Sequence, residues 1–73
     1  MYDPKKIENA VLALLGAFEF DHGRAWKRYD FDVMDALAEQ GFISDPRRGT
    51  ESVALSETGL ARAKLLAQQL FCA

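Results

Sequence analysis

The first stretch of apolar residues recurs at helical spacing between about residues 4 and 19. Intervals of three and four residues predict a helix with one apolar face. Asp3 followed by Pro4 marks the start, because a carboxylate accepts a backbone N–H and proline suits the first helical position. Leu12 and Phe20 lie outside this apolar face, so we expect a central helix that is apolar around much of its circumference. The predicted inward stripe is Ile7, Val11, Leu14, Leu15 and Phe18.

Two later stretches also predict helices. Asp30 can cap the second helix, and Gly41 suits a left-handed end with Phe42 as the apolar contact that follows it. Ser56 can cap the third, which has Glu57 in its first turn. The expected inward residues are Phe31, Met34, Leu37 and Ala38 in the second helix, and Leu60, Ala63, Leu66 or Ala67, and Leu70 in the third.

Two short β-prone runs, residues 42–44 and 52–55, flank a polar segment with Asp45, Pro46 and Gly49, which predicts a hairpin with a long loop. Residues 21–23 should end the first helix, and residues 24–29 fit either a short strand or one helical turn. Trp26 and Tyr29 are expected to fold back on the core. We therefore expect one mainly α domain over residues 1–73, with a small β-hairpin (α+β) before the last helix.

Residues 31–60 resemble the winged-helix domains of bacterial repressors of the MarR and PadR kinds. The likeness lies in Leu-Ala-Glu-Gln-Gly-Phe-Ile at 37–43, the basic hairpin, and Leu-Ser-Glu-Thr-Gly-Leu at 55–60. It implies a winged-helix-like fold with three main helices, a recognition helix ending in glycine, and the hairpin as wing. The chain departs from a repressor before residue 30, where one clear helix stands in place of two.

Across its whole length the chain is also similar to a family of short uncharacterised bacterial proteins. This likeness rests on Gly-Arg-Ala-Trp-Lys at 23–27, Asp-Phe-Asp at 30–32, Ile-Ser-Asp-Pro at 43–46 and Leu-Ser-Glu at 55–57. It implies no known activity.

Composition indicates a small core with apolar residues to spare. Of 73 residues 49% are hydrophobic, while one cysteine and one histidine preclude a disulfide framework or a zinc cluster within one chain. Self-association into a homo-oligomer is the remaining means of stabilisation. We see no secretion signal, and the longest apolar stretch, residues 10–18, is too short for a membrane span. We expect a cytoplasmic protein without metal or cofactor.

The charges of the chain weigh against a function in DNA binding. The formal net charge is −2, and the predicted second helix carries acidic residues but no Lys or Arg, which opposes contact with phosphates. Its Asp32, Asp35 and Glu39 could instead face a basic partner. The basic residues are either solvated surface or contacts for phosphates or an acidic partner, and they are Arg24, Lys27, Arg28, Arg47 and Arg48.

No catalytic constellation is visible. His22 has no Ser or Cys nearby, and Cys72 lies almost at the end of the chain, so we expect no enzyme. We expect a protein-interaction or regulatory module, whose acidic helix and basic hairpin present opposite charges on separate surfaces. The alternative is a winged-helix regulator that binds DNA mainly through phosphate contacts.

Overall fold

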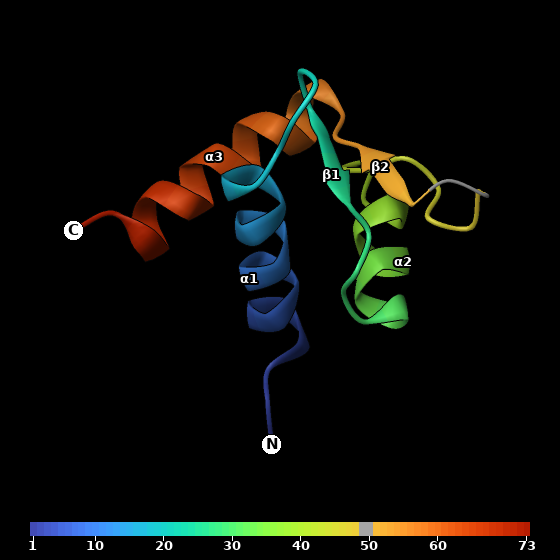
Figure 1. Cartoon of the computed structure of the whole chain (residues 1–73). Coiled ribbons are helices and arrows are strands. Elements are labelled where there is room, and N and C mark those ends of the chain that lie inside the picture. The colour runs from blue at the N-terminus through green and yellow to red at the C-terminus, as the bar shows by residue number, and fades with distance from the viewer. Residues whose placement is uncertain (49–50) are drawn as a thin grey trace.

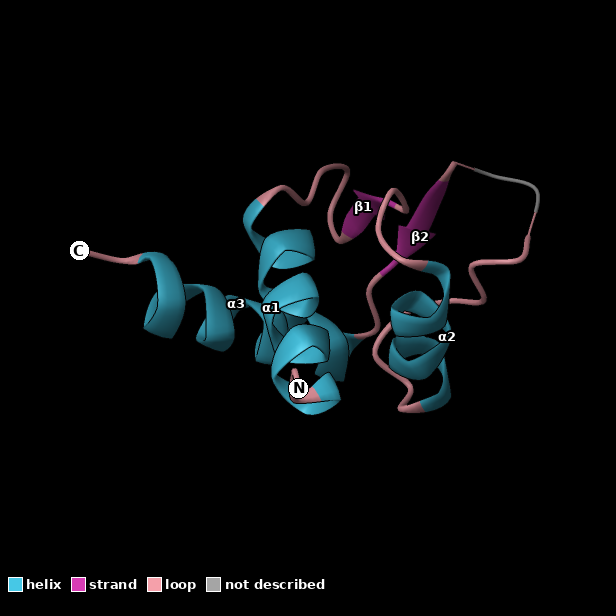
Figure 2. Cartoon of the chain, turned by 90° about the horizontal axis from the view of Figure 1, so that it is seen from below, coloured by secondary structure: helices cyan, strands magenta, loops and turns pink. Residues whose placement is uncertain are grey.

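The computed structural model describes residues 1–48 and 51–73 as three helices and one two-stranded antiparallel sheet (Figure 1). The elements are α1 (Pro4–Ala17), β1 (Arg24–Trp26), α2 (Phe31–Glu39), β2 (Ser52–Ala54) and α3 (Glu57–Phe71). α3 packs across α1, while α2 and the sheet lie on the other side of α1 (Figures 1 and 2). The expectation of a mainly helical α+β chain is confirmed. Among the described residues, no helix is long and apolar enough to cross a membrane.

The predicted helix starts are confirmed at all three caps. The side-chain oxygens of Asp3, Asp30 and Ser56 accept hydrogen bonds from backbone N–H groups in the first turns of α1, α2 and α3. The bond lengths are 2.9, 3.2 and 2.9 Å. Each cap satisfies one of the amide groups that a helix start leaves without an intrahelical partner.

The predicted end of α2 is also confirmed. Gly41 has a φ of +79°, the left-handed conformation that glycine adopts without steric penalty. Its N–H donates to Ala38 at 3.0 Å, and the N–H of Phe42 donates to Leu37 at 3.1 Å. These two bonds define a Schellman motif, which turns the chain back toward the core.

The hairpin prediction is confirmed only in part, because the main partner of the second run is a different segment. β2 forms where expected, but its partner is β1, with Ala25 opposite Val53. Residues 42–44 contribute one isolated bridge, between Ile43 and Leu55, with backbone hydrogen bonds from Ser44 to Ala54 at 2.8 Å and from Ser56 to Phe42 at 2.9 Å. The segment diverges after Ser44 because Pro46 has no N–H with which to continue a ladder. Gly49, expected in the loop, lies outside the described residues.

Residues 21–29 thus contain a strand rather than a helical turn. Asp21, His22 and Gly23 all have positive φ values, and they reverse the chain so that Phe20 and Arg24 exchange two backbone hydrogen bonds of 2.7 and 2.8 Å. The reversal carries the chain away from α1 and directly into β1.

The inward face of α1 differs from the predicted stripe. Leu12 and Leu15 are buried, whereas Ile7 is 40% exposed and Phe18 is 67% exposed. The cause is that α1 is covered on two sides, by α3 and by α2 with the sheet, so the residues between these contacts become innermost. The buried core is Leu12, Ala13, Leu15, Ala25, Met34, Leu37, Ile43, Val53, Leu55, Ala63 and Leu66.

Three other residues expected inside are exposed. Phe31 at the start of α2 is 60% exposed, Leu70 near the end of α3 is 55% exposed, and Trp26 is 47% exposed. Trp26 is exposed because strand side chains alternate between faces and its neighbour Ala25 takes the buried one. Tyr29, by contrast, packs against the core as predicted.

Candidate protein interface

The five basic residues predicted as phosphate or acidic-partner contacts do not form one patch. Arg24 lies on β1 and uses its guanidinium within the sheet, donating to the Ser52 hydroxyl at 2.7 and 3.0 Å and to the Ser52 carbonyl at 3.3 Å. Arg24 therefore ties β1 to β2 across the ladder.

Lys27 is the first residue after β1, and it holds the loop that follows α2 in the chain. Its Nζ donates to the carbonyl oxygens of Pro46 at 2.6 Å and Arg48 at 2.8 Å. Two backbone acceptors on one ammonium group fix the course of this loop, because a charged donor makes stronger hydrogen bonds than a neutral one. Lys27 therefore has a structural role, since it binds this loop to the end of β1.

Arg47 is paired with the predicted acidic face. Its Nη2 lies 2.8 Å from Oδ2 of Asp35, and its guanidinium lies 5.9 Å from the ring centroid of Phe31. The expectation that the acidic helix and the basic loop present their charges on separate surfaces is therefore wrong, because the loop folds back along α2. Asp32 and Glu39 remain exposed on α2.

Arg28 and Arg48 are exposed. The Arg28 guanidinium stacks 5.5 Å from the ring centroid of Trp26, whose other contact is with Phe20 at 4.8 Å and an interplanar angle of 35°. Such stacking holds a half-exposed tryptophan in a defined orientation. A groove of about 300 Å³ runs beside it, and its lining residues are Leu14, Leu15, Phe18, Ala25, Trp26, Arg28 and Tyr29.

The groove continues onto the outward face of α1. At about 100° per residue, an arc of about 120° opposite Leu12 holds six positions of α1 and its C-cap, and none of the six is charged. Exposed Lys6 lies at the edge of this arc. Ile7 at one end of this face and Ala17 and Phe18 at the other are exposed, and the three side chains between them are half-buried. We call this face the α1 stripe; it consists of Ile7, Ala10, Val11, Leu14, Ala17 and Phe18. Together with Trp26 and Tyr29 it forms the α1–β1 surface.

Sequence reasoning missed this surface, although it contained the signal. The helical periodicity predicts four members of the α1 stripe to lie inside. The signal is that the first helix is apolar around much of its circumference, because a helix covered on two sides by a small domain keeps a third side open.

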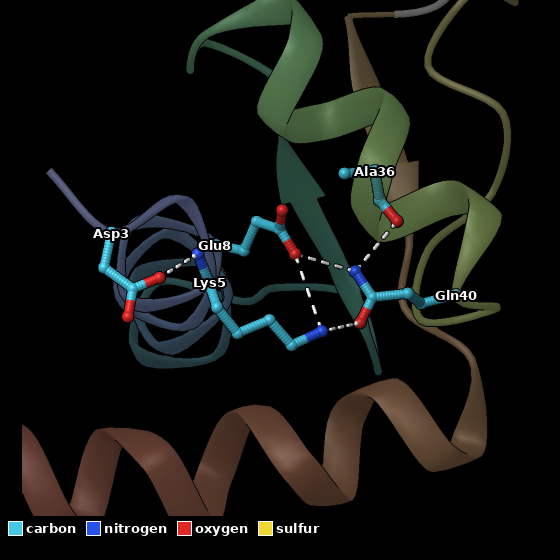
Figure 3. A network of polar contacts seen from close by, with 5 residues as sticks. All are labelled: Asp3, Lys5, Glu8, Ala36 and Gln40. Carbon is cyan, nitrogen blue, oxygen red and sulfur yellow. Dashed lines mark hydrogen bonds and ion pairs between the residues drawn. The ribbon is translucent and has the colours of Figure 1, made fainter.

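The opposite edge of α1 is closed by polar contacts with α2 (Figure 3). The side-chain amide of Gln40 accepts from Lys5 Nζ at 2.8 Å and donates to Glu8 at 2.9 Å and to the carbonyl of Ala36 at 3.0 Å. Lys5 and Glu8 also lie 3.7 Å apart. This network fixes α1 beside α2. Ile7, at one end of the α1 stripe, lies at the margin of this contact, in a pocket that it lines with Asp32 and Val33 of α2.

Glu19 secures the loop that carries the chain from α1 to β1. Its carboxylate accepts from the Gly23 N–H at 2.8 Å and pairs with Lys64 of α3 at 3.3 Å. The Gly23 hydrogen bond, followed by that from Lys64, lowers the pKa of Glu19 below its ordinary value of 4.5. His22 beside this loop is exposed.

Within residues 1–48 and 51–73, no charged or polar side chain is buried, and no group of three or more His, Cys, Asp or Glu could hold a metal ion. The candidate binding features of the described chain therefore lie at its surface, where uncharged and aromatic side chains gather.

Comparison with known proteins places the chain in a family. The family model described as Domain of unknown function (DUF6429) matches residues 3–73. The chain is 41% identical over 69 residues to the uncharacterized protein y4hR of Sinorhizobium fredii (strain NBRC 101917 / NGR234). The match covers 94% of this chain and 93% of that protein. No solved structure matches the chain. The resemblance to short uncharacterised bacterial proteins is thus confirmed, and the chain belongs to the DUF6429 family.

Proposed function

We propose that this chain is a protein-interaction module that binds through the α1–β1 surface. The observation that carries the proposal is the α1 stripe, an uncharged helix face that ends beside the half-exposed Trp26. Contiguous exposed apolar surface on a soluble domain is a feature of protein interaction sites. Tryptophan, tyrosine and arginine, which border the groove here, are also the residue types that dominate binding energy at protein interfaces.

The charge distribution favours a protein partner over DNA. Three of the five basic residues have internal partners, namely Ser52 for Arg24, backbone carbonyls for Lys27 and Asp35 for Arg47. Phosphate contacts by these residues would have to replace existing bonds. Asp32 and Glu39 on α2 would also repel a phosphate backbone.

A winged-helix-like scaffold is part of this proposal. The order helix, strand, helix, strand, helix supports it, as does the bridge from Ile43 to Leu55, which adds a minimal third segment to the sheet. In this scheme α2 stands where a recognition helix would be. The interaction surface, however, is on α1 and β1.

Site-specific photo-crosslinking in the native cell tests the proposal. A photoreactive amino acid replaces Ala17 in the α1 stripe, and the matched control replaces Ala61, an equally small exposed residue on α3. We expect a protein adduct of discrete mass from position 17 and none from position 61. Equal labelling from both positions, or none from position 17, would contradict the proposal. Duplex binding with a Kd near 10⁻⁸ M or tighter at physiological salt, about the range of specific regulators, would replace it with the DNA alternative.

A further inference from the structure

We infer that the protein bound by the α1 stripe is a second copy of this chain, docked with its α1 antiparallel to the first. The inference rests on the proposed function and names the partner for that surface. The argument depends on the spacing of the stripe, on the charges at its two ends and on the projecting end of α3.

The spacing of the α1 stripe suits a partner helix of the same sequence. Ile7, Ala10, Leu14 and Ala17 follow one another at intervals of three, four and three residues, the pattern of a helix–helix seam. In an antiparallel pair centred between residues 12 and 13, Ile7 faces Phe18 of the second copy. Val11 faces Leu14 in the same register. The small Ala10 and Ala17 let the two helices approach closely, while larger side chains fill the centre and both ends of the seam.

Charge favours the antiparallel orientation. Exposed Lys6 precedes the stripe and exposed Asp21 follows it, so an antiparallel pair brings each lysine toward the second copy's aspartate. Asp3 is engaged as the helix cap. A parallel pair would place like charges together at both ends, and it would also align the two helix dipoles unfavourably.

The end of α3 extends the contact. A standard interface buries about 800 Å² per partner, more than one face of a 14-residue helix supplies. α3 projects past α1 on the side away from α2, as two views at right angles agree (Figures 1 and 2). Leu70 follows buried Leu66 by four residues and lies on the same face of α3 that packs on α1, yet it is exposed. A second copy beside α1 would cover it.

The test combines oligomeric mass with a charge exchange across the seam. Sedimentation equilibrium measures the wild-type chain and the variants Ile7→Lys, Phe18→Glu and Ile7→Lys/Phe18→Glu. Each single variant places a charge against an apolar side chain of the second copy. The double variant places lysine against glutamate twice, but only if the helices are antiparallel. Phe31→Glu is the matched control, because Phe31 has a similar exposure on α2, away from the stripe.

We expect a wild-type dimer, a dimer Kd raised by about a hundredfold or more in each single variant, and recovery of the dimer in the double variant. The control should dimerise like the wild type. Circular dichroism verifies that each variant is folded, and Ala17→Glu, at an exposed position of the stripe, replaces any single variant that is not.

A wild-type chain that stays monomeric at millimolar concentration would overturn the inference, as would a dimer that the single variants leave intact. A dimer weakened equally by all variants, the double included, would overturn the antiparallel arrangement. The proposed function fails separately. A monomer that still crosslinks a protein of another mass from position 17 refutes the second copy alone, whereas a monomer without adduct refutes both.

Discussion

Among the glycines that the structure describes, Gly59 in the first turn of α3 lies closest to other backbone atoms, and Gly59→Ala tests the importance of this contact. A Cβ atom at this position would lie 2.7 Å from the carbonyl carbon and 2.8 Å from the Cα of Phe42, and nearer still to the carbonyl oxygen. All three are backbone atoms, so no side-chain rotation relieves the clash. Either the start of α3 or the chain after α2 has to move.

Two effects of opposite sign determine the magnitude. Replacing glycine by alanine within a helix normally stabilises by about 1 kcal/mol. Overpacking of a tight contact costs about 1 to 3 kcal/mol, and more when the neighbour is fixed. Phe42 is fixed here, because its carbonyl accepts from the Ser56 N–H at 2.9 Å and its own N–H closes the Schellman motif. We therefore expect a net loss of about 2 kcal/mol in the free energy of unfolding.

Thermal unfolding followed by circular dichroism measures this loss. For a domain of this size 2 kcal/mol corresponds to a fall in Tm of about 8 to 16 °C. Thr58→Ala, at the exposed neighbouring position, is the control and should leave the Tm nearly unchanged. A Tm for Gly59→Ala equal to or above that of the wild type would refute the packing of α3 against Phe42.

Three further predictions follow from particular contacts. In urea unfolding, Leu15→Ala should lose about 2 to 5 kcal/mol and Leu14→Ala clearly less, because only Leu15 is fully buried; equal losses would mean that the face of α1 is misplaced. Lys27→Met should lower the free energy of unfolding by about 1 to 2 kcal/mol, because two loop carbonyls lose their hydrogen-bond donor. An unchanged free energy of unfolding would show that these two hydrogen bonds do not stabilise the fold. The lowered pKa of Glu19 means that its carboxylate stabilises the fold above pH 4.5 and ceases to do so as the pH falls through its folded pKa. The difference in the free energy of unfolding between the wild type and Glu19→Gln should therefore become smaller on acidification. A difference that is constant with pH would contradict the contact with Gly23.

The local structure could be predicted from the amino-acid sequence. Asp3, Asp30 and Ser56 were recognisable as helix caps and Gly41 as a helix end, because these signals depend on a few neighbouring residues and on backbone geometry. The helices and the position of β2 followed from the same reasoning.

Long-range pairing was not predictable in this way. The choice of β1 rather than residues 42–44 as the main partner of β2 depends on the turn at residues 21–23, where two residues other than glycine adopt left-handed conformations. The local pattern predicts that the helix ends at residues 21–23, but it does not predict the direction of the turn. Positive φ values are uncommon outside glycine even for Asp and His, which adopt them more often than most residues.

The candidate site was predictable only in part. Arg24, Lys27 and Arg47 were recognised as surface cations, but their partners come from segments at least 12 residues away. The sequence predicts four of the six residues of the α1 stripe inside, because periodicity shows which residues share a helix face and not how many faces a small domain can cover.

The most direct test of the α1–β1 surface as an interface is a concentration series of two-dimensional amide NMR spectra. We expect shifts that depend on concentration at Ile7, Leu14, Phe18 and the end of α3, and constant signals at Phe31 and along the exposed face of α2. Changes centred on α2, or spectra that stay constant from about 10 µM to 1 mM, the range in which weak association at a Kd of 10⁻⁴ M is visible, would contradict the account.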